Sequence, residues 1–247
     1  MNGVLLVTGG SRGIGAAVAM LAARHGFDVA VNYRDDERAA ASVVDAARST
    51  GVRGLAIRAD VSVEADVIRM FEAVDTFGPL AVLVNNAGVT GGFARVADLS
   101  AANLQRTLAV NVTGAILCAR EAVRRLSTVW GGSGGSIVNV SSIAARLGGA
   151  GEWVHYAASK GAIDTFTIGL AREVAAEGVR VNAVAAGIVD TEMHATAGDP
   201  HRAKRTGATI PLGRAATPNE IAEAIVWLAS PAASYVTGAI LEAGGGR

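Results

Sequence analysis

A glycine-rich stretch near the start of the chain constrains the fold more than any other feature. Residues 8–15 read Thr-Gly-Gly-Ser-Arg-Gly-Ile-Gly. They follow the apolar run 4–7, which predicts a buried strand, and lead into 16–24, which is typical of a helix. Such a turn can hold a phosphate, because N–H groups at the start of a helix lack intrahelical partners and carry partial positive charge. Taken alone, the pattern also fits a tight loop without a ligand.

The glycines of this turn have distinct expected roles. Gly9 permits the tight turn, Gly13 lets a phosphate approach the backbone, and Gly15 lets the helix pack closely against the strand. Their spacing is Gly-x-x-x-Gly-x-Gly rather than the commoner Gly-x-Gly-x-x-Gly. The expected binding turn also includes Ser11, Arg12 and Ile14.

Strand-like apolar runs alternate with helical stretches along the whole chain. The predicted strands are 3–8, 28–32, 54–59, 81–85, 136–141, 179–184 and 238–242, and the predicted helices are 13–26, 36–50, 63–77, 101–128, 155–177 and 217–229. This alternation predicts one α/β domain over 1–247, a Rossmann-type doubly wound parallel sheet of seven strands. We interpret 131–135 as a flexible surface loop and about 187–216, which follows the sixth strand, as a substrate loop.

Composition excludes several classes of function. Lys and Arg together number 22, as do Asp and Glu, so no net charge attracts nucleic acid or an anionic membrane. The single Cys118 excludes an intramolecular disulfide, and we expect a buried thiol. His194 and His201 have no partners at ligand spacing, so no metal site is predicted. Without a signal peptide or an apolar run of membrane-spanning length, we expect a cytoplasmic protein.

Tyr156 and Lys160 form the first candidate pair for chemistry. They lie four residues apart on a predicted helix, so they share a face. A free tyrosine has a pKa of about 10, and a nearby ammonium would lower this pKa toward the working range of a proton-transfer group. The alternative is a Tyr and a Lys on a solvated helix face. His155 is also adjacent, but neighbours on a helix face different directions, which leaves it at most a place in the pocket lining.

Two further polar residues support a catalytic role for Tyr156 and Lys160. Ser142 ends a predicted strand fourteen residues before Tyr156, where a short loop can bring it back to the phenol. Strand alternation directs the neighbouring Ser141 to the opposite face. Asn111 lies within a predicted helix, where asparagine is unfavourable, so it is either functional or a kinking or exposed residue.

The ordered set of motifs resembles the short-chain dehydrogenase/reductase family over essentially the whole chain. The set comprises the glycine turn, Asn85-Asn86-Ala87-Gly88, Asn111, Ser141-Ser142 and Tyr156-Ala-Ala-Ser-Lys160. The resemblance implies an oxidoreductase that moves a hydride between a nicotinamide and a carbonyl or alcohol carbon. It also implies a catalytic tetrad of Asn111, Ser142, Tyr156 and Lys160, in which the asparagine holds a water that links the lysine to solvent.

The resemblance further implies a cofactor frame. Tyr33 stands where NAD-dependent relatives usually carry an acid, and Arg34 and Arg12 lie near the same place, so we expect a preference for NADP. Asp35 and Asp36 keep NAD possible. The remaining expected cofactor contacts are Asp60, Val61, Asn86, Ala87, Gly88, Tyr156, Lys160, Gly187, Ile188 and Thr191. The family's Pro-Gly after strand six is replaced by Ala186-Gly187, which leaves the rigidity of that turn open.

The sequence does not identify the substrate. Ketones, sugars or polyols, steroids and 3-oxoacyl thioesters all remain open, and a carrier-protein substrate would favour a basic patch. Residues that would form one are Arg124, Arg125, Arg202, Lys204 and Arg205. A non-catalytic NADP-sensing protein is the alternative class, but such proteins commonly lose the Tyr-Lys pair. The alanine-rich helices 101–128 and 155–177, with the final strand 239–241, predict a homotetramer.

Overall fold

The sheet has seven strands, all parallel, in the order β3-β2-β1-β4-β5-β6-β7. The computed structural model describes residues 3–196 and 198–247, apart from the side chains at 194 and 196. The strands are β1 (Val4–Val7), β2 (Asp28–Tyr33), β3 (Gly54–Arg58), β4 (Leu80–Asn85), β5 (Gly135–Ser142), β6 (Val179–Ala186) and β7 (Ile240–Ala243). The predicted doubly wound sheet is confirmed, and the central strands are apolar runs because helices cover both faces.

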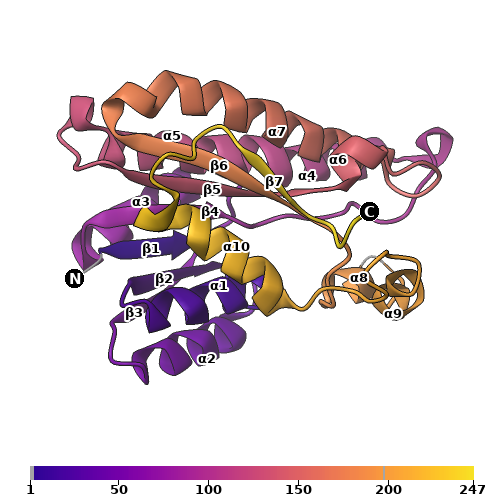
Figure 1. Cartoon of the computed structure of the whole chain (residues 1–247), viewed down its shortest axis with the longest axis horizontal. Coiled ribbons are helices and arrows are strands. Elements are labelled where there is room, and N and C mark those ends of the chain that lie inside the picture. The colour runs from indigo at the N-terminus through magenta and orange to yellow at the C-terminus, as the bar shows by residue number, and fades with distance from the viewer. Residues whose placement is uncertain (1–2, 197) are drawn as a thin grey trace.

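Helices pack on both sides of the sheet (Figure 1). The α-helices are α1 (Gly13–Arg24), α2 (Glu37–Arg48), α3 (Glu64–Phe77), α4 (Ala101–Leu108), α5 (Ala115–Leu126), α6 (Ala144–Leu147), α7 (Val154–Val174), α8 (Met193–Thr196), α9 (Arg202–Gly207) and α10 (Pro218–Ala229). One apolar core lies between the sheet and α1, α2 and α10, and a second lies between the sheet and α3, α5 and α7. Among the described residues, no helix is long and apolar enough to cross a bilayer.

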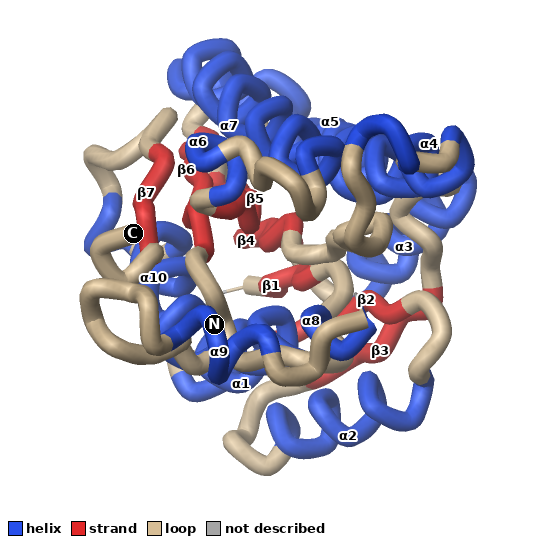
Figure 2. Tube along the Cα trace, turned by 90° about the vertical axis from the view of Figure 1, so that its right-hand side faces the viewer, coloured by secondary structure: helices blue, strands red, loops and turns tan. Residues whose placement is uncertain are grey.

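The order of the strands reverses between β1 and β4, which places the two halves of the sheet on either side of a central crevice. Figure 2 shows β1 between β2 and β4, with α8 and α9 in front of this region. Ligands of open α/β sheets bind in the crevice beyond the carboxyl ends of the strands at such a reversal. The glycine turn after β1 and the polar ends of β4 and β5 all lie at this edge.

Asn32 links three strand ends beside the crevice. Its carboxamide oxygen accepts a hydrogen bond from the Gly9 N–H at 3.1 Å. Its amide nitrogen donates to the carbonyl oxygens of Ala59 at 3.0 Å and Ile57 at 3.3 Å. The side chain is buried, so these bonds replace the water that would otherwise satisfy the backbone groups. Asn32 therefore fixes the start of the glycine turn relative to β2 and β3.

The single helix predicted over 101–128 is divided into three parts. α4 ends at Leu108, a π-helical turn covers Ala109–Gly114, and α5 begins at Ala115. A Cβ at Gly114 would lie 2.8 Å from the Val61 carbonyl oxygen, so only glycine lets this turn pack against the end of β3. π-helical turns of this kind are frequent at functional sites. Cys118 is buried on α5, and burial raises the pKa of its thiol to about 12.

The segment 131–135, predicted to be a flexible surface loop, packs closely against backbone at some of its glycines. A Cβ at Gly132 would lie 2.4 Å from the Arg125 carbonyl oxygen, and one at Gly134 would lie 2.7 Å from that of Gly178, whereas Gly131 is exposed with open space around it. The Gly134 N–H also donates to the Leu126 carbonyl oxygen at 2.7 Å. Gly132 and Gly134 are present because the chain passes close to neighbouring backbone.

The segment 187–216 leaves and rejoins the fold at one place. Val189 and Ala216 form a parallel bridge, in which the Ala216 N–H donates to the Ile188 carbonyl oxygen at 2.9 Å. Between these ends the segment carries the short helices α8 and α9, which lie beyond the carboxyl ends of the strands (Figure 1). The segment therefore extends over the crevice from a fixed base.

We predict that Asn32→Ala lowers the free energy of unfolding by about 2–4 kcal/mol, because it leaves several buried backbone groups without hydrogen bonds. Urea unfolding followed by circular dichroism measures this loss. Asn103→Ala, in which an exposed asparagine on α4 is truncated, is the matched control. A loss in Asn32→Ala no larger than in this control would contradict the role assigned to Asn32.

Candidate active site

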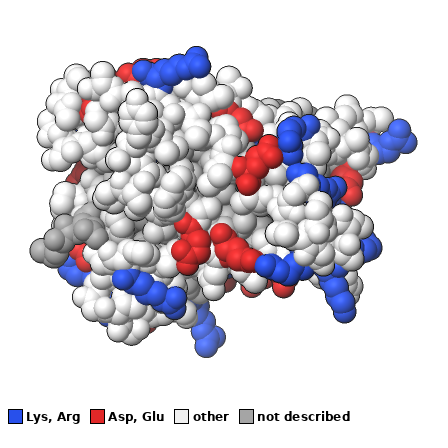
Figure 3. All heavy atoms as spheres, viewed as in Figure 1, with Lys and Arg blue, Asp and Glu red and all other residues white. Residues whose placement is uncertain are grey.

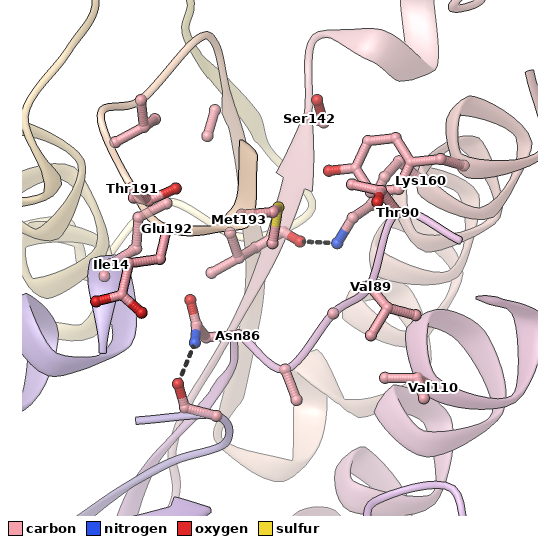
Figure 4. Close-up of a pocket in the computed structure, with 18 of the residues that line it drawn as sticks. Ile14, Asn86, Val89, Thr90, Val110, Ser142, Lys160, Thr191, Glu192 and Met193 are labelled. Carbon is pink, nitrogen blue, oxygen red and sulfur yellow. Dashed lines mark hydrogen bonds between the residues drawn. The ribbon is translucent and has the colours of Figure 1, made fainter. Parts of the chain in front are cut away.

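A cavity of about 600 Å³ lies over the carboxyl ends of the central strands. Figure 4 shows Ile14, Thr191 and Glu192 on one side of it and Val89, Ser142 and Lys160 on the other. The lining contains every predicted site residue except Gly15 and Asn111, which lie directly behind it: Gly9, Ser11, Arg12, Gly13, Ile14, Tyr33, Arg34, Asp60, Val61, Asn86, Ala87, Gly88, Ser142, Tyr156, Lys160, Gly187, Ile188 and Thr191.

The glycine turn has the backbone conformation that a phosphate-binding loop requires. Gly9 and Gly13 have φ values of +61° and +54°, which side-chain-bearing residues rarely adopt. A Cβ at Gly15 would lie 2.6 Å from the Gly9 carbonyl oxygen, so this position is limited to glycine. The N-cap residue of α1, Arg12, makes no side-chain capping bond, and the first turn of α1 has no acidic residue. The helix start is thus suited to an anion.

The end of β4 fixes this turn from the other side. The Asn86 amide donates to the carbonyl oxygens of Thr8 at 2.9 Å and Gly9 at 3.0 Å (Figure 4). The Thr8 hydroxyl oxygen accepts hydrogen bonds from the N–H groups of Asn86 and Ala87, both at 3.0 Å. Thr8 begins the glycine-rich stretch and Asn32 lies in a predicted strand, but no local pattern predicted their roles, because both bind backbone distant in sequence.

Ser142, Tyr156 and Lys160 meet at the opposite wall. Ser142 and Tyr156 both line the cavity, and the Ser142 side chain is near enough to the phenol to lower its pKa in part. The Lys160 Nζ donates to the Val140 carbonyl oxygen at 2.7 Å and lies 5.7 Å from the centroid of the Tyr156 ring. A Cβ at Gly88 would approach Nζ to 3.6 Å, so glycine at this position keeps space beside the ammonium.

Burial controls the electrostatics of this group. Burial raises the pKa of Tyr156, and the nearby Ser142 side chain only partly opposes that rise. Burial also lowers the pKa of Lys160 to about 8, against the opposing charge of Asp164. The expected lowering of the Tyr156 pKa by the ammonium is not observed in this structure, in which burial is the largest cause and raises that pKa. Burial therefore moves the two pKa values apart and disfavours the charged form of both groups.

Asn111 links the loop after β4 to α7 through hydrogen bonds. In the π-helical turn its Oδ1 accepts a hydrogen bond from the Val89 N–H at 2.8 Å. Its Nδ2 donates to the Val89 carbonyl oxygen at 2.8 Å and to the Ser159 hydroxyl at 3.0 Å. Asn111 is thus fully engaged next to Lys160. Ser141 faces the other way, where its hydroxyl contacts the Lys160 carbonyl oxygen at 3.4 Å and Asp164.

The far end of the cavity carries the charged residues expected near the cofactor ribose. Tyr33 is buried at the end of β2, and Arg12 and Arg34 are half-exposed at the rim. Arg12 donates to Glu192 at 2.8 Å and to Asp36 at 3.4 Å. Arg34 donates to Asp35 at 2.6 Å.

The carboxylates at this rim differ in their engagement. Asp36 also accepts the Ala39 N–H at 2.9 Å and so caps α2. Burial alone would raise the pKa of Asp60, but hydrogen bonds from Ser62 and Arg106 hold it below its usual value. Asp60 is consequently an ionised acceptor in the cavity wall.

Main-chain hydrogen bonds fix the Ala186-Gly187 turn after β6, where the family typically has Pro-Gly. The Ala186 carbonyl oxygen accepts the Ile143 N–H at 3.0 Å, and the Gly187 N–H donates to the Ala243 carbonyl oxygen at 2.9 Å. A Cβ at Gly187 would lie 2.8 Å from the Gly244 Cα. The turn is thus held between β5 and β7 without the ring of a proline.

His155 and His201 do not line this cavity. His155 is buried, and its Nε2 lies 2.9 Å from the Thr90 carbonyl oxygen. It does not line the cavity, so the pocket-lining role that the sequence left open is not observed. His201 is exposed at the start of α9, and the side chain of His194 lies outside the described residues.

The five basic residues considered for a carrier-protein surface do not form one patch. α5 runs back from the carboxyl edge of the sheet, so Arg124 and Arg125 lie at the amino edge, where Arg125 donates to Asp75 at 2.7 Å. On α9, Arg202 is buried against Glu152 and Arg205 pairs with Asp199. Figure 3 shows acidic side chains interspersed with the basic ones on the face it presents.

Comparison with known proteins identifies relatives over the full length. A family model described as Enoyl-(Acyl carrier protein) reductase matches residues 9–247. An uncharacterised oxidoreductase of Escherichia coli is 52% identical over 99% of both chains. Cis-4-hydroxycyclohexanecarboxylate dehydrogenase of Sinomonas cyclohexanicum is 42% identical over 98% of this chain and 95% of that protein. L-rhamnose 1-dehydrogenase (NAD(P)(+)) of a Sphingomonas strain is 38% identical over 98% of this chain and 94% of that protein.

Solved structures show the same fold. A short-chain dehydrogenase of Burkholderia cenocepacia in complex with NADP superposes with a TM-score of 0.90 and is 34% identical, over 98% of this chain and 96% of that one. At this identity and coverage the comparison extends from the sheet to the elements that form the cavity.

We predict that the buried ammonium of Lys160 makes stability depend on pH. The unfolded chain holds this proton up to the ordinary lysine pKa of 10.5, whereas the folded protein releases it above about 8. Between these values the unfolded chain binds more protons, so the stability of the wild type rises with pH relative to Lys160→Met, by up to about 3 kcal/mol. Urea unfolding of both proteins at pH 7 and pH 10 tests this difference.

Lys204→Met is the matched control, because it removes an exposed lysine from α9. It provides the baseline for the loss of a surface charge. Parallel stability curves for the wild type and Lys160→Met between pH 7 and pH 10 would contradict the prediction.

Proposed function

Since the chain belongs to the short-chain dehydrogenase/reductase family, we propose that it interconverts a ring ketone and the corresponding alcohol, with NADP as hydride carrier. The protein is an NAD(P)-dependent oxidoreductase acting between a carbonyl and an alcohol. The observation that carries the proposed site is the proximity of the Ser142 side chain to the Tyr156 phenol inside the cavity that the glycine turn closes at its other end.

The residues of the proposed site have separate roles. A bound nicotinamide supplies or accepts the hydride. Tyr156 gives its phenolic proton to the substrate oxygen during reduction and takes it back during oxidation. Ser142 hydrogen-bonds the same oxygen and orients it. Lys160, fixed by the Val140 carbonyl oxygen, places positive charge beside the phenol, and Asn111 holds the Val89 loop against α7.

The cofactor fits the residues that line the cavity. The backbone of Gly9, Gly13 and the start of α1 would hold the pyrophosphate. Glycine at position 88 leaves space beside Lys160 and Asn111 that a Cβ would fill. Asp60 would bind the adenine, and Arg12 and Arg34 would hold the additional phosphate of NADP. Among the described residues, no cluster of three potential metal ligands occurs.

A ring-shaped substrate is supported by the relatives and by the cavity. Three relatives have names that specify a ring substrate, one a hydroxycyclohexanecarboxylate and two a sugar. In this chain the centroid of the Trp153 ring lies 5.7 Å from that of Tyr156, so an indole borders the reacting position. Met193 and Leu147 add apolar surface to the same cavity. A compact ring fits such an environment.

Two other functions are less well supported. A 3-oxoacyl thioester on a carrier protein agrees with the description of the family model, but the basic residues at the cavity mouth are paired with carboxylates. A non-catalytic NADP sensor would not need Tyr156 and Ser142 close together inside the cavity. Both alternatives predict that ring ketones fail to oxidise NADPH.

Three further proposals come from the sequence and the surface. A homotetramer formed through α4, α5 and α7 is supported by the large apolar side chains exposed on these helices. These side chains are Leu104, Leu108, Ile116, Val154 and Ile168. The segment 187–216 is proposed to close over the bound substrate from its bridged base. The cytoplasm remains the expected location.

We predict that Tyr156→Phe reduces kcat for NADPH-dependent reduction of ring ketones at least about a hundredfold, because it removes the acid–base group. NADPH binding, followed by fluorescence titration, should change by no more than a few fold. A panel of cyclohexanones with absorbance detection of NADPH measures the turnover. Tyr235→Phe is the control because Tyr235 is fully exposed. Activity of Tyr156→Phe above a tenth of wild type would rule out the assignment.

We also predict that kcat/KM for NADPH exceeds that for NADH by about a hundredfold, since two charge-assisted contacts from Arg12 and Arg34 favour the additional phosphate. The double variant Arg12→Ala, Arg34→Ala should lose at least about tenfold of this ratio. Arg38→Ala, an exposed arginine of α2 outside the cavity, is the control. A wild-type ratio below one, or an unchanged ratio in the double variant, would contradict the prediction.

A further inference from the structure

A buried ion pair closes the substrate end of the cavity. Arg202, the first residue of α9, donates from Nη1 and Nη2 to the two carboxylate oxygens of Glu152 at 2.9 and 2.6 Å. The Arg202 side chain is only 7% exposed, whereas that of Glu152 is 42% exposed. Both residues line the same cavity as Tyr156. The pair therefore joins the segment 187–216 to the loop before α7, next to the proposed reaction site.

Aromatic side chains hold the guanidinium in place. The Arg202 Cζ lies 4.6 Å from the centroid of the Trp153 ring and 5.4 Å from that of Phe93. The rings of Trp153 and Phe93 stack with centroids 4.7 Å apart. Trp153 in turn contacts Tyr156, so one indole separates the guanidinium from the proposed catalytic phenol. The ion pair and the phenol therefore contact the same indole at the same end of the cavity.

The ion pair has unused hydrogen-bonding capacity. The Arg202 Nε is buried without a partner among the described residues. An arginine cannot lose its proton at ordinary pH, so this N–H remains a donor without an acceptor. The Glu152 carboxylate accepts one bond from Arg202 on each oxygen and retains further lone pairs on its exposed side. A charged donor and a charged acceptor are thus available together.

Resting on the proposed function, we propose that Arg202 and Glu152 form a recognition subsite for hydroxyl groups on the substrate ring, remote from the reacting carbon. A hydroxyl matches the pair because it both donates, to Glu152, and accepts, from the Arg202 guanidinium. The pair is neutral as a whole, so it favours a neutral hydroxylated ring, such as a sugar or a hydroxycyclohexanone, over an anion. Arg202 and Glu152 are specificity-determining residues that take no part in proton transfer.

Three ketones of similar size test the subsite: 4-hydroxycyclohexanone, 4-methylcyclohexanone and 4-oxocyclohexanecarboxylate. In the wild type we expect kcat/KM for the hydroxy compound to exceed that for the methyl compound by about tenfold to a hundredfold, the range for hydrogen bonds to charged groups. In the double variant Glu152→Gln, Arg202→Gln this preference should fall at least about tenfold. The double change leaves no unpaired charge, so folding is retained.

The matched control is the double variant Asp199→Asn, Arg205→Gln, which neutralises an ion pair of the same segment that does not line the cavity. It should keep the wild-type preference. Equal preference in the wild type and in Glu152→Gln, Arg202→Gln would overturn the subsite. A wild-type preference for the carboxylate compound that this variant loses would also overturn it, in favour of an anion site.

Calorimetric titration of the same ketones into the enzyme with NADP separates this inference from the proposed function. If no ring ketone is reduced but the hydroxy compound still binds more tightly than the methyl compound, and only when Glu152 and Arg202 are present, the proposed reaction fails and the subsite stands. If binding shows no difference between the two compounds, the subsite is overturned whatever the turnover.

Discussion

The attachment of the glycine turn to the end of β4 is the contact on which the site depends. Asn86 and Thr8 form it through four hydrogen bonds between segments far apart in the sequence. Because the strand order reverses here, the two halves of the sheet meet only through β1 and β4, and this network sets their carboxyl ends in register. The turn proposed to bind phosphate and the wall that carries Lys160 are thereby held at a fixed separation.

Burial shifts the pKa values of the two titratable groups on the opposite wall of the cavity. Tyr156 and Lys160 lie where desolvation disfavours both charged forms, which raises one pKa and lowers the other. Neither group is neutralised by a salt bridge. Lys160 is held by the Val140 carbonyl oxygen and experiences the charge of Asp164. Tyr156 packs against Trp153 near Ser142. A site of this kind responds strongly to a charged or hydrogen-bonding ligand, because added interactions act in a region with little water.

The substrate end is built from residues of separate loops. Phe93 follows β4, Glu152 and Trp153 precede α7, and Arg202 begins α9. The Ala94 N–H donates to the Glu152 carbonyl oxygen at 2.8 Å, which links the first two loops, and the Arg202 ion pair adds the third. The scaffold fixes the chemistry at the strand ends, while these loops shape the space that selects the substrate.

The sequence by itself determined the class of fold, because alternating apolar runs and helical stretches leave few arrangements, and the glycine turn marks the start of the first helix. It also placed Tyr156 and Lys160 on one face of a helix and directed Ser142 and Ser141 to opposite faces of a strand, since helix and strand periodicity fix which side chains share a face. Only the tertiary structure decided the direction of the Tyr156 pKa, the packing of Gly132 and Gly134 and the pairing of Arg202 with Glu152. These depend on burial and on contacts between distant segments, which no local pattern in the chain encodes.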